Sequence, residues 1–206
     1  MIAIVDYGVG NLFSLKSSFE AVGAEVVVTG DKETIEQAEK IVLPGVGAFE
    51  DAAKKLRESG LAEVVKAQAA QGKPLLGICL GMQLLFDESH EYGVHKGLGL
   101  IEGKVVSMQG VIPERLQIPQ IGWNALKFHQ SHPVLKYIKE GDFVYFVHSY
   151  FATDCEKDLL SSVEYGAQIT AAVAKGNVVG MQFHPEKSGN VGLNLLRAFV
   201  EWEQTV

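Results

Sequence analysis

Short apolar runs alternate with amphipathic segments along the first half of the chain. Four of these runs lack polar alternation, which is typical of strands buried on both faces of a sheet. They are Ile2–Val5, Glu25–Val28, Lys40–Leu43 and Leu75–Ile78. The spacing of apolar residues between them predicts helices over Asn11–Val22, Phe49–Glu58, Leu61–Gln71 and Gly81–Phe86. Strands separated by helices in this way predict a parallel sheet with helices on both faces.

The second half of the chain has a different pattern, because its apolar segments follow one another across short turns. The strands predicted there are Leu100–Met108, Trp123–Phe128, Asp142–Val147, Leu160–Val163, Thr170–Ala174 and Val178–Phe183. We interpret them as antiparallel additions to the parallel sheet, followed by a final helix over Val191–Trp202. The expected fold class is α/β: an open, mostly parallel, flavodoxin-like sheet in three layers. No linker or repeat interrupts it, so a single domain is expected over residues 1–206.

Composition excludes several classes of protein. The chain has 206 residues, of which 47% are hydrophobic and 21% charged, as in a globular protein with a sizeable core. Its net charge of −7 and lack of a basic tract argue against binding to nucleic acid or an anionic membrane. No apolar run approaches the roughly 20 residues that cross a bilayer, and no targeting signal precedes the first strand. Two cysteines form no disulfide framework, so a cytoplasmic location is expected.

One cysteine lies in a recognisable turn. Gly77-Ile78-Cys79-Leu80-Gly81 joins a predicted buried strand to a helix, the Gly-x-nucleophile-x-Gly arrangement of many hydrolases. Glycines relieve the crowding of such a turn, and a thiol at a helix N-terminus is favoured as thiolate. We therefore interpret Cys79 as a nucleophile and the N–H of Leu80 as an oxyanion donor, the alternative being a buried structural cysteine. Cys155, in a polar segment, has no such context and no expected role.

A cysteine nucleophile requires a base and a group that orients the base. His184-Pro185-Glu186 follows the last predicted strand. Residues i and i+2 of an extended segment point to the same side, about 7 Å apart. We therefore expect Glu186 to reach one imidazole nitrogen of His184 while the other nitrogen faces Cys79. A plain turn is the alternative interpretation of this segment.

Two loops with paired glycines follow predicted strands. Gly8-Val9-Gly10 begins like a dinucleotide-binding motif, but Phe13 takes the place of the third glycine, so no nucleotide cofactor is expected. In the other loop, the backbone at Gly45, Val46 and Gly47 can turn N–H groups toward a developing oxyanion. An ordinary strand-to-helix turn is the alternative for that loop.

One pair of histidines superficially resembles a metal site. His90 and His95 flank a glutamate, but they are five residues apart and would not share a face of a helix. We expect neither a metal nor another cofactor.

Taken together, the cysteine turn, the glycine loop and the His-Pro-Glu segment resemble the class I, triad-type glutamine amidotransferases. The similarity covers essentially the whole chain, and within that family it is greatest to the glutaminase subunits of imidazole glycerol phosphate synthases. The segments that carry it are Ile4–Leu12, Gly77–Ser89, Pro119–Asn124, Tyr145–Tyr150 and Gln182–Ser188. Each segment alone is weak evidence, whereas all five in this order are specific.

The resemblance implies that the chain hydrolyses glutamine to glutamate and ammonia through a thioester on Cys79. It implies that His184 moves the protons, that Glu186 orients His184, and that the N–H groups of Leu80 and of the Gly45–Gly47 loop stabilise the oxyanion. The residues that would hold the glutamine head group are Gln83, Ser149 and Tyr150.

The resemblance also implies a heterodimer with a (β/α)₈-barrel cyclase subunit that receives the ammonia. That cyclase converts a phosphoribosyl-formimino carboxamide ribonucleotide to imidazole glycerol phosphate and an aminoimidazole carboxamide ribonucleotide, in histidine biosynthesis. The positions implied around the ammonia exit are Trp123, Tyr145, His148 and Lys187, and plain core or surface roles are the alternative for the last three. The other functions left open are a glutaminase serving pyridoxal phosphate synthesis, a cysteine peptidase or thiol hydrolase, and a non-enzymatic binding module.

Overall fold

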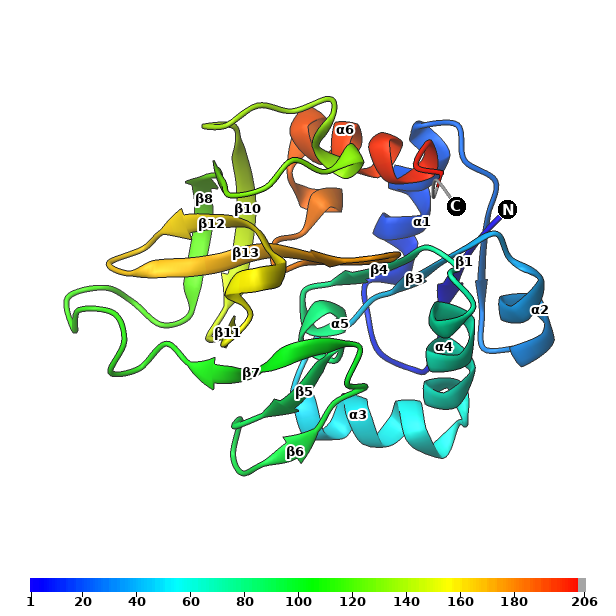
Figure 1. Cartoon of the computed structure of the whole chain (residues 1–206), viewed down its shortest axis with the longest axis horizontal. Coiled ribbons are helices and arrows are strands. Elements are labelled where there is room, and N and C mark those ends of the chain that lie inside the picture. The colour runs from blue at the N-terminus through cyan, green and yellow to red at the C-terminus, as the bar shows by residue number, and fades with distance from the viewer. Residues whose placement is uncertain (204–206) are drawn as a thin grey trace.

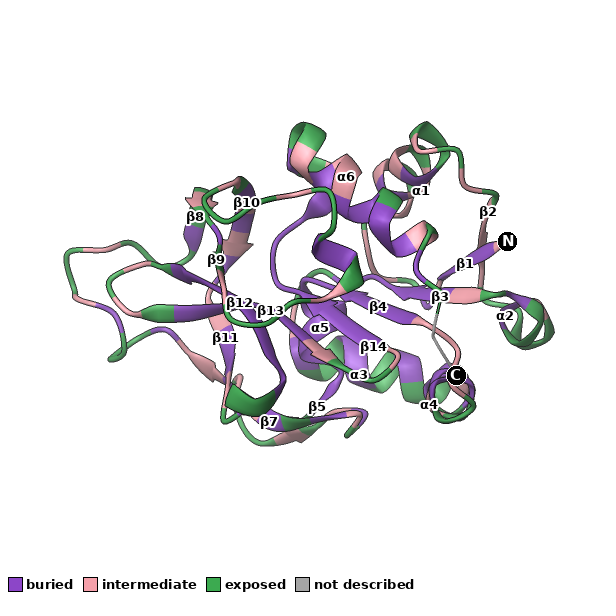
Figure 2. Ribbon diagram, turned by 45° about the horizontal axis from the view of Figure 1, so that its top comes forward, coloured by how far each residue is buried: buried purple, intermediate pink, exposed green. Residues whose placement is uncertain are grey.

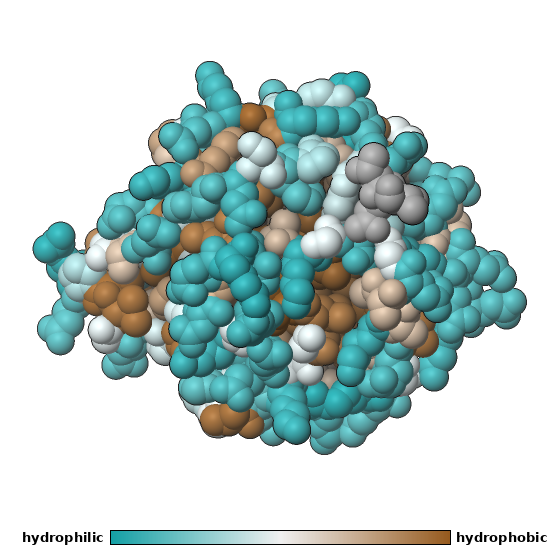
Figure 3. All heavy atoms as spheres, viewed as in Figure 1, coloured by the Kyte–Doolittle hydropathy of each residue, from teal (hydrophilic) through white to brown (hydrophobic). Residues whose placement is uncertain are grey.

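Residues 1–203 are described in the computed structural model of the chain, and they form sheets flanked by helices (Figure 1). The helices are α1 (Leu12–Ala21), α2 (Lys32–Gln37), α3 (Phe49–Glu58), α4 (Leu61–Ala70), α5 (Leu80–Gln83) and α6 (Gly189–Val200). No helix in this range is long and apolar enough to span a membrane. Seen from the side of Figure 1, the surface is mostly hydrophilic, and hydrophobic residues show in separate small areas (Figure 3).

The largest sheet of residues 1–203 has eight strands and carries the loops of the candidate site. Their order is β2 (Val26–Thr29), β1 (Ile2–Val5), β3 (Lys40–Leu43), β4 (Leu75–Ile78), β14 (Val178–Met181), β13 (Gln168–Lys175), β12 (Leu159–Glu164) and β9 (Lys127–Phe128). The first five strands are parallel, and β13, β12 and β9 continue the sheet in antiparallel pairing. The predicted open, mostly parallel α/β sheet is confirmed.

The sequence predicts that the strands of the second half all extend this sheet, but only some of them do. Two further sheets form, one of β10 (Phe143–His148) and β8 (Gln120–Ala125), the other of β11 (Tyr150–Thr153), β7 (Ile101–Ser107), β5 (Phe86–Ser89) and β6 (His95–Lys96). The predicted helix over Gly81–Phe86 is wrong in extent, because α5 ends at Gln83 and Phe86 begins β5. The single strand predicted over Trp123–Phe128 is divided between β8 and β9, which belong to different sheets.

Two helical layers cover the central sheet. Helices α1 and α6 lie on one face, and α3, α4 and α5 lie on the other (Figure 1). Side chains of β1 alternate between the two cores: Ile2 and Ile4 pack with the α1 and α6 side, while Ala3 and Val5 pack with the α3 and α4 side. Strands β1, β4 and β14 are buried throughout and β3 after its first residue, whereas the edge strand β2 is half-buried (Figure 2). Burial on both faces explains the continuous apolar runs in the sequence.

Helix α2 was not predicted, because it is only six residues long and buries a single side chain, Ile35. It begins at Asp31, whose carboxylate accepts a hydrogen bond from the backbone N–H of Thr34 at 2.8 Å. This is an ordinary N-cap, and it was the available sequence signal for the helix.

The carboxyl ends of β1, β3, β4 and β14 lie at one edge of the sheet, because these strands are parallel neighbours. The loops that follow them contain the paired glycines, Cys79 and the His-Pro-Glu segment. The topology therefore brings segments that are far apart in sequence to one place, as is usual for sites in open α/β sheets.

Candidate active site

Cys79 occupies a strained backbone conformation between β4 and α5. Its φ of 54° and ψ of −113° are rare for a residue with a side chain, and such strain costs about 1–3 kcal/mol. The turn is held by hydrogen bonds on both sides: Cys79 N–H donates to the carbonyl of Met181 at 2.7 Å, and Gln83 N–H donates to the carbonyl of Cys79 at 3.2 Å. The cysteine is thereby fixed at the end of the sheet.

The two glycines of this turn are required by backbone contacts. A Cβ atom on Gly81 would lie 1.9 Å from the carbonyl oxygen of Leu43, and one on Gly77 would lie 2.7 Å from the carbonyl oxygen of Gly81. Real Cβ atoms do not come this close to backbone. Glycine at both positions therefore lets the turn pack against itself and against the end of β3.

His184 and Glu186 contact each other through a turn, and the extended geometry predicted for this segment is wrong. Pro185–Lys187 form a single 3₁₀ turn, in which proline is tolerated at the first position. Within it, Nδ1 of His184 lies 2.7 Å from Oε1 of Glu186, and the two side chains are only 4% and 3% exposed. Because Nδ1 is engaged by the carboxylate, Nε2 of His184 remains for other chemistry.

The charge of His184 follows from its neighbours. Nε2 is buried and has no hydrogen-bond partner within residues 1–203. Burial lowers the pKa of His184, but its polar interactions with Cys79 and Glu186 outweigh burial and raise the pKa to about 9. The imidazole is thus protonated at neutral pH.

The loop after β3 is held beside the cysteine turn. Tyr7 donates a hydrogen bond from its hydroxyl to the carbonyl of Pro44 at 2.6 Å, and burial together with the charge at Cys79 raises the pKa of Tyr7. A Cβ on Gly45 would meet the backbone nitrogen of Gly81 at 2.8 Å. The N–H of Leu80 has no acceptor among the described residues. The N–H of Leu80 is therefore a free hydrogen-bond donor beside Cys79.

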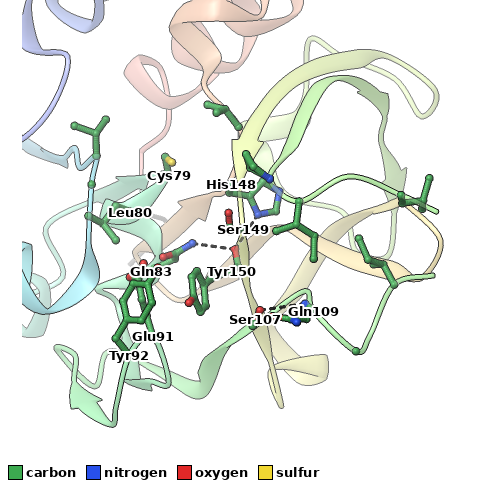
Figure 4. A pocket seen from close by; sticks show the side chains of 18 of the residues that line it. Cys79, Leu80, Gln83, Glu91, Tyr92, Ser107, Gln109, His148, Ser149 and Tyr150 are labelled. Carbon is green, nitrogen blue, oxygen red and sulfur yellow. Dashed lines mark hydrogen bonds between the residues drawn. The ribbon is translucent and has the colours of Figure 1, made fainter. Parts of the chain in front are cut away.

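A cavity of about 1080 Å³ joins these groups (Figure 4). Its lining includes the predicted nucleophile and base, the exposed part of the glycine loop, and the three residues predicted to hold glutamine. These are Cys79, His184, Val46, Gly47, Leu80, Gln83, Ser149 and Tyr150. Gly45 and Glu186 are not part of the lining, but Gly45 packs against the backbone of Gly81 and Glu186 contacts His184, so the structure brings together every residue predicted for the chemistry.

Comparison with known proteins agrees with this arrangement. The profile of the family "Glutamine amidotransferase class-I" matches residues 3–202. The chain belongs to the class-I glutamine amidotransferase family. It is 51% identical to the imidazole glycerol phosphate synthase subunit HisH of Geobacillus kaustophilus over 97% of this chain and 96% of that one. It is 48% identical to the HisH subunit of Sulfurimonas denitrificans over 98% of both chains.

Solved structures of low sequence identity share the fold of this amidotransferase. A crystal structure described as a glutamine amidotransferase superposes with a TM-score of 0.76 at 21% identity, over 98% of both chains. A chain of PurLQS from Thermotoga maritima superposes with a TM-score of 0.72 at 22% identity, over 96% of both chains. The family and fold class predicted from sequence are therefore confirmed.

The predicted glutamine-binding residues of the amidotransferase contribute in different ways. The amide nitrogen of Gln83 donates to the carbonyl of Tyr150 at 3.1 Å (Figure 4). The carbonyl of Ser149 accepts from the N–H of Met108 at 3.0 Å, whereas its side chain lines the cavity. Tyr150 and Ser149 thus use their backbone carbonyls within the protein, and the groups left to meet a ligand include the amide oxygen of Gln83 and the hydroxyl of Ser149.

Sequence reasoning missed three residues at this site. Glu91 and Tyr92 line the cavity, and the carboxylate of Glu91 accepts from the N–H of Phe49 at 2.7 Å, at the start of α3. Gln182 contacts both Cys79 and Gln83 from behind the cavity wall. Its position two residues before His184, at the end of a buried strand, was a usable signal, whereas nothing in the spacing indicated Glu91.

The two histidines around Glu91 do not form a metal site. His90 lies 2.8 Å from Glu88 and His95 lies 3.7 Å from Glu50. Within residues 1–203, no group of three or more His, Cys, Asp or Glu side chains is arranged to hold a metal ion.

Three of the four predicted interface residues lie together at the surface. The rings of Trp123 on β8 and Tyr145 on β10 meet edge to face at 6.0 Å, and the ammonium of Lys187 lies 6.0 Å from the centre of the Tyr145 ring. His148 does not belong to this surface, contrary to the prediction. It is buried on the opposite face of β10 and lines the cavity, and burial lowers its pKa to about 4.

The two cysteines have different environments. Cys155 is buried, its sulfur lies 4.0 Å from the hydroxyl of Thr170, and burial raises its pKa to about 11. Its thiol is therefore neutral at physiological pH. Both cysteines are free.

We predict that Gly81→Ala destabilises the protein by more than about 2 kcal/mol, because its Cβ would collide with the backbone of Leu43. The control is Gly23→Ala, whose Cβ meets no atom within 4 Å but is added at a positive φ, of 83°, a backbone strain that is absent at Gly81. The control should cost only about 1 kcal/mol of backbone strain. Urea unfolding of both variants measures the difference, and equal losses would show that the contact does not matter.

We predict that Glu186→Gln lowers the pKa of His184, since the amide keeps an acceptor for Nδ1 but removes the negative charge. The proton that the native protein keeps up to about pH 9 would then be lost at lower pH. NMR titration of ¹⁵N-labelled histidine measures the change, with the His184 signal assigned by its absence in His184→Asn. The control is Glu58→Gln, on the exposed face of α3, which should leave the pKa of His184 unchanged. An unchanged pKa of His184 in Glu186→Gln would show that the charge of Glu186 does not raise it.

Proposed function

We propose that the chain is the glutaminase subunit of an imidazole glycerol phosphate synthase, acting in histidine biosynthesis. It hydrolyses glutamine to glutamate and ammonia. The observation that carries this proposal is that Cys79 and His184 line one cavity beside a free backbone donor, while Glu186 contacts His184 from behind the cavity wall. Its support from comparison is the level of identity, about 50% over nearly the full length, to proteins named HisH.

The proposed reaction starts with attack of the Cys79 thiolate on the side-chain carbonyl carbon of glutamine. A carbon–sulfur bond forms and the carbonyl electrons move to oxygen. His184 gives its proton to the nitrogen, the carbon–nitrogen bond breaks, and ammonia leaves behind a thioester. His184 then takes a proton from water as the water oxygen attacks the thioester, and the products are glutamate and the regenerated thiolate.

The oxyanion of both tetrahedral intermediates would be stabilised by the N–H of Leu80 and by N–H groups of the Gly45–Gly47 loop. One such donor typically contributes a factor of about 10²–10³ in rate. Glu186 would keep the imidazole with Nε2 toward Cys79, as the carboxylate does in other triads. Gln83 and Ser149 would contact the amino and carboxylate groups of the substrate, because their free polar atoms line the cavity.

We propose that the outer face of the β8–β10 sheet binds the cyclase subunit, a (β/α)₈ barrel, in a heterodimer. Apolar side chains alternate outward from both strands: Ile121, Trp123 and Phe143 are each more than half exposed, and Tyr145 is half-buried between them. Aromatic residues gathered in this way are typical of protein interfaces. Lys187 and Val147 border both this face and the cavity, so ammonia would leave on this side.

A cytoplasmic location is part of the proposal, because Cys79 must remain a free thiol to act. The proposal includes no metal or cofactor, since each step uses side chains and backbone of this chain with glutamine and water.

We predict that Cys79→Ala abolishes formation of glutamate from glutamine without loss of folding, because no other thiol reaches the cavity wall. Glu186→Ala should leave a measurable remnant, since the base remains. Glutamate is measured with and without the cyclase subunit and its ribonucleotide, and Cys155→Ala is the control, with native activity expected. Turnover by Cys79→Ala, or hydrolysis of peptides in preference to glutamine, would overturn the proposal.

We predict that Trp123→Ala weakens binding of the cyclase subunit at least about tenfold, as expected for a central aromatic of an interface. The control is Phe13→Ala, an equally apolar change at a side chain that is 82% exposed on α1. Calorimetric titration of each variant with the cyclase subunit measures the affinity. Equal affinities for the two variants would place the interface elsewhere.

A further inference from the structure

Gln182 is a completely buried polar residue that joins the nucleophile to the wall of the cavity. It follows β14, and its backbone N–H donates to the carbonyl of Ala171 at 2.8 Å. Its amide nitrogen lies 3.8 Å from the sulfur of Cys79, and its amide oxygen accepts a hydrogen bond from the amide nitrogen of Gln83 at 3.0 Å. The side chain of Gln182 thus contacts both the sulfur of Cys79 and the amide of Gln83.

These contacts determine how the amide of Gln83 is oriented. Both hydrogens of its nitrogen are used, one by the carbonyl of Tyr150 at 3.1 Å and the other by Gln182. A rotated amide would bring its oxygen against two acceptors and lose both bonds. The oxygen of Gln83 consequently points away from them, and within residues 1–203 nothing donates to it.

The orientation of Gln182 depends in turn on the charge at Cys79. A thiolate only accepts hydrogen bonds, so it favours the nitrogen of Gln182 on its side. The oxygen of Gln182 is then directed to Gln83. A negative charge at the nucleophile therefore selects one orientation of two successive amides, and the second of these amides presents an acceptor at the cavity.

We propose that Gln182 is a positioning residue that couples the thiolate of Cys79 to the orientation of Gln83. Its nitrogen stabilises the thiolate, and its oxygen holds the acceptor of Gln83 toward the ammonium group of glutamine. This inference rests on the proposed function, because it concerns the same nucleophile and substrate. A polar residue that merely completes the core would have neither effect.

The test begins with Gln182→Met, which keeps the length of the side chain but removes both the donor and the acceptor. The rate at which iodoacetamide alkylates Cys79 at a fixed pH near neutrality should fall about tenfold, which corresponds to one lost hydrogen bond to a charged group. This readout requires no turnover. Thr170→Val is the matched control, because it removes a buried hydrogen bond of 2.8 Å in β13 away from the cavity, and it should leave alkylation unchanged.

The second readout is a double-mutant cycle on the KM for glutamine, measured on the complex with the cyclase subunit. Gln182→Met should raise KM about tenfold in the native background and have less than about a twofold effect when Gln83 is already alanine, because Gln182 acts on the substrate through Gln83. Additive effects would show that Gln182 does not work through Gln83 and would overturn the coupling.

A third variant keeps the test decisive if Gln182→Met does not fold. Gln182→Asn retains the amide but is one methylene shorter, so it cannot reach Cys79 and Gln83 together, and the same two changes are expected in reduced size. Native alkylation and native KM in a folded Gln182 variant would refute the inference while leaving the proposed function intact. Activity of Cys79→Ala would instead refute the proposed function itself.

Discussion

The site depends on a contact between two backbones. The turn that carries Cys79 packs so closely on the end of β3 that a single Cβ on Gly81 would come within 1.9 Å of the carbonyl of Leu43. This approach brings the backbone of Leu80 beside Gly45 and keeps Cys79 in a conformation that a side chain rarely adopts. A free N–H and the sulfur consequently face the same space, at the edge where the parallel strands end.

The two cysteines of the chain differ in their electrostatic surroundings. Burial is the largest influence on Cys155, and together with nearby acidic side chains it outweighs the hydrogen bond to Thr170 and raises the pKa of that thiol to about 11. Cys79 is buried as well, but it has His184 beside it, and the pKa of His184 is raised to about 9 by its polar interactions with Cys79 and Glu186 despite burial. An anion at Cys79 thus has a cation as its neighbour, whereas an anion at Cys155 would have none.

The sequence predicted correctly the elements that are determined by residues close together along the chain. The buried strands β1, β3 and β4 and the helix α3 have the predicted bounds, and the residues around Cys79 were found from the two glycines that the turn requires. The errors come from long-range pairing: α5 stops after one turn because Phe86 enters a strand beside β7. Gln182 was missed for the same reason, and the choice between a surface and a buried His148 stayed open, since only the folded chain brings these residues to the site.

The His-Pro-Glu turn is connected directly to the exposed β8–β10 sheet. The hydroxyl of Ser188 donates to the carbonyl of His184 at 2.6 Å and accepts from the N–H of Tyr145 at 2.9 Å, while His184 N–H donates to the carbonyl of Tyr145 at 2.9 Å. On the outer side of the same strand, Tyr145 contacts Trp123. A shift of β10 would therefore move the backbone of His184 with it, because buried and partly buried hydrogen bonds of this kind are costly to break. The base His184 and the exposed aromatic face of the β8–β10 sheet are therefore expected to move together. This coupling is required if a partner bound to that face is to affect the chemistry at Cys79.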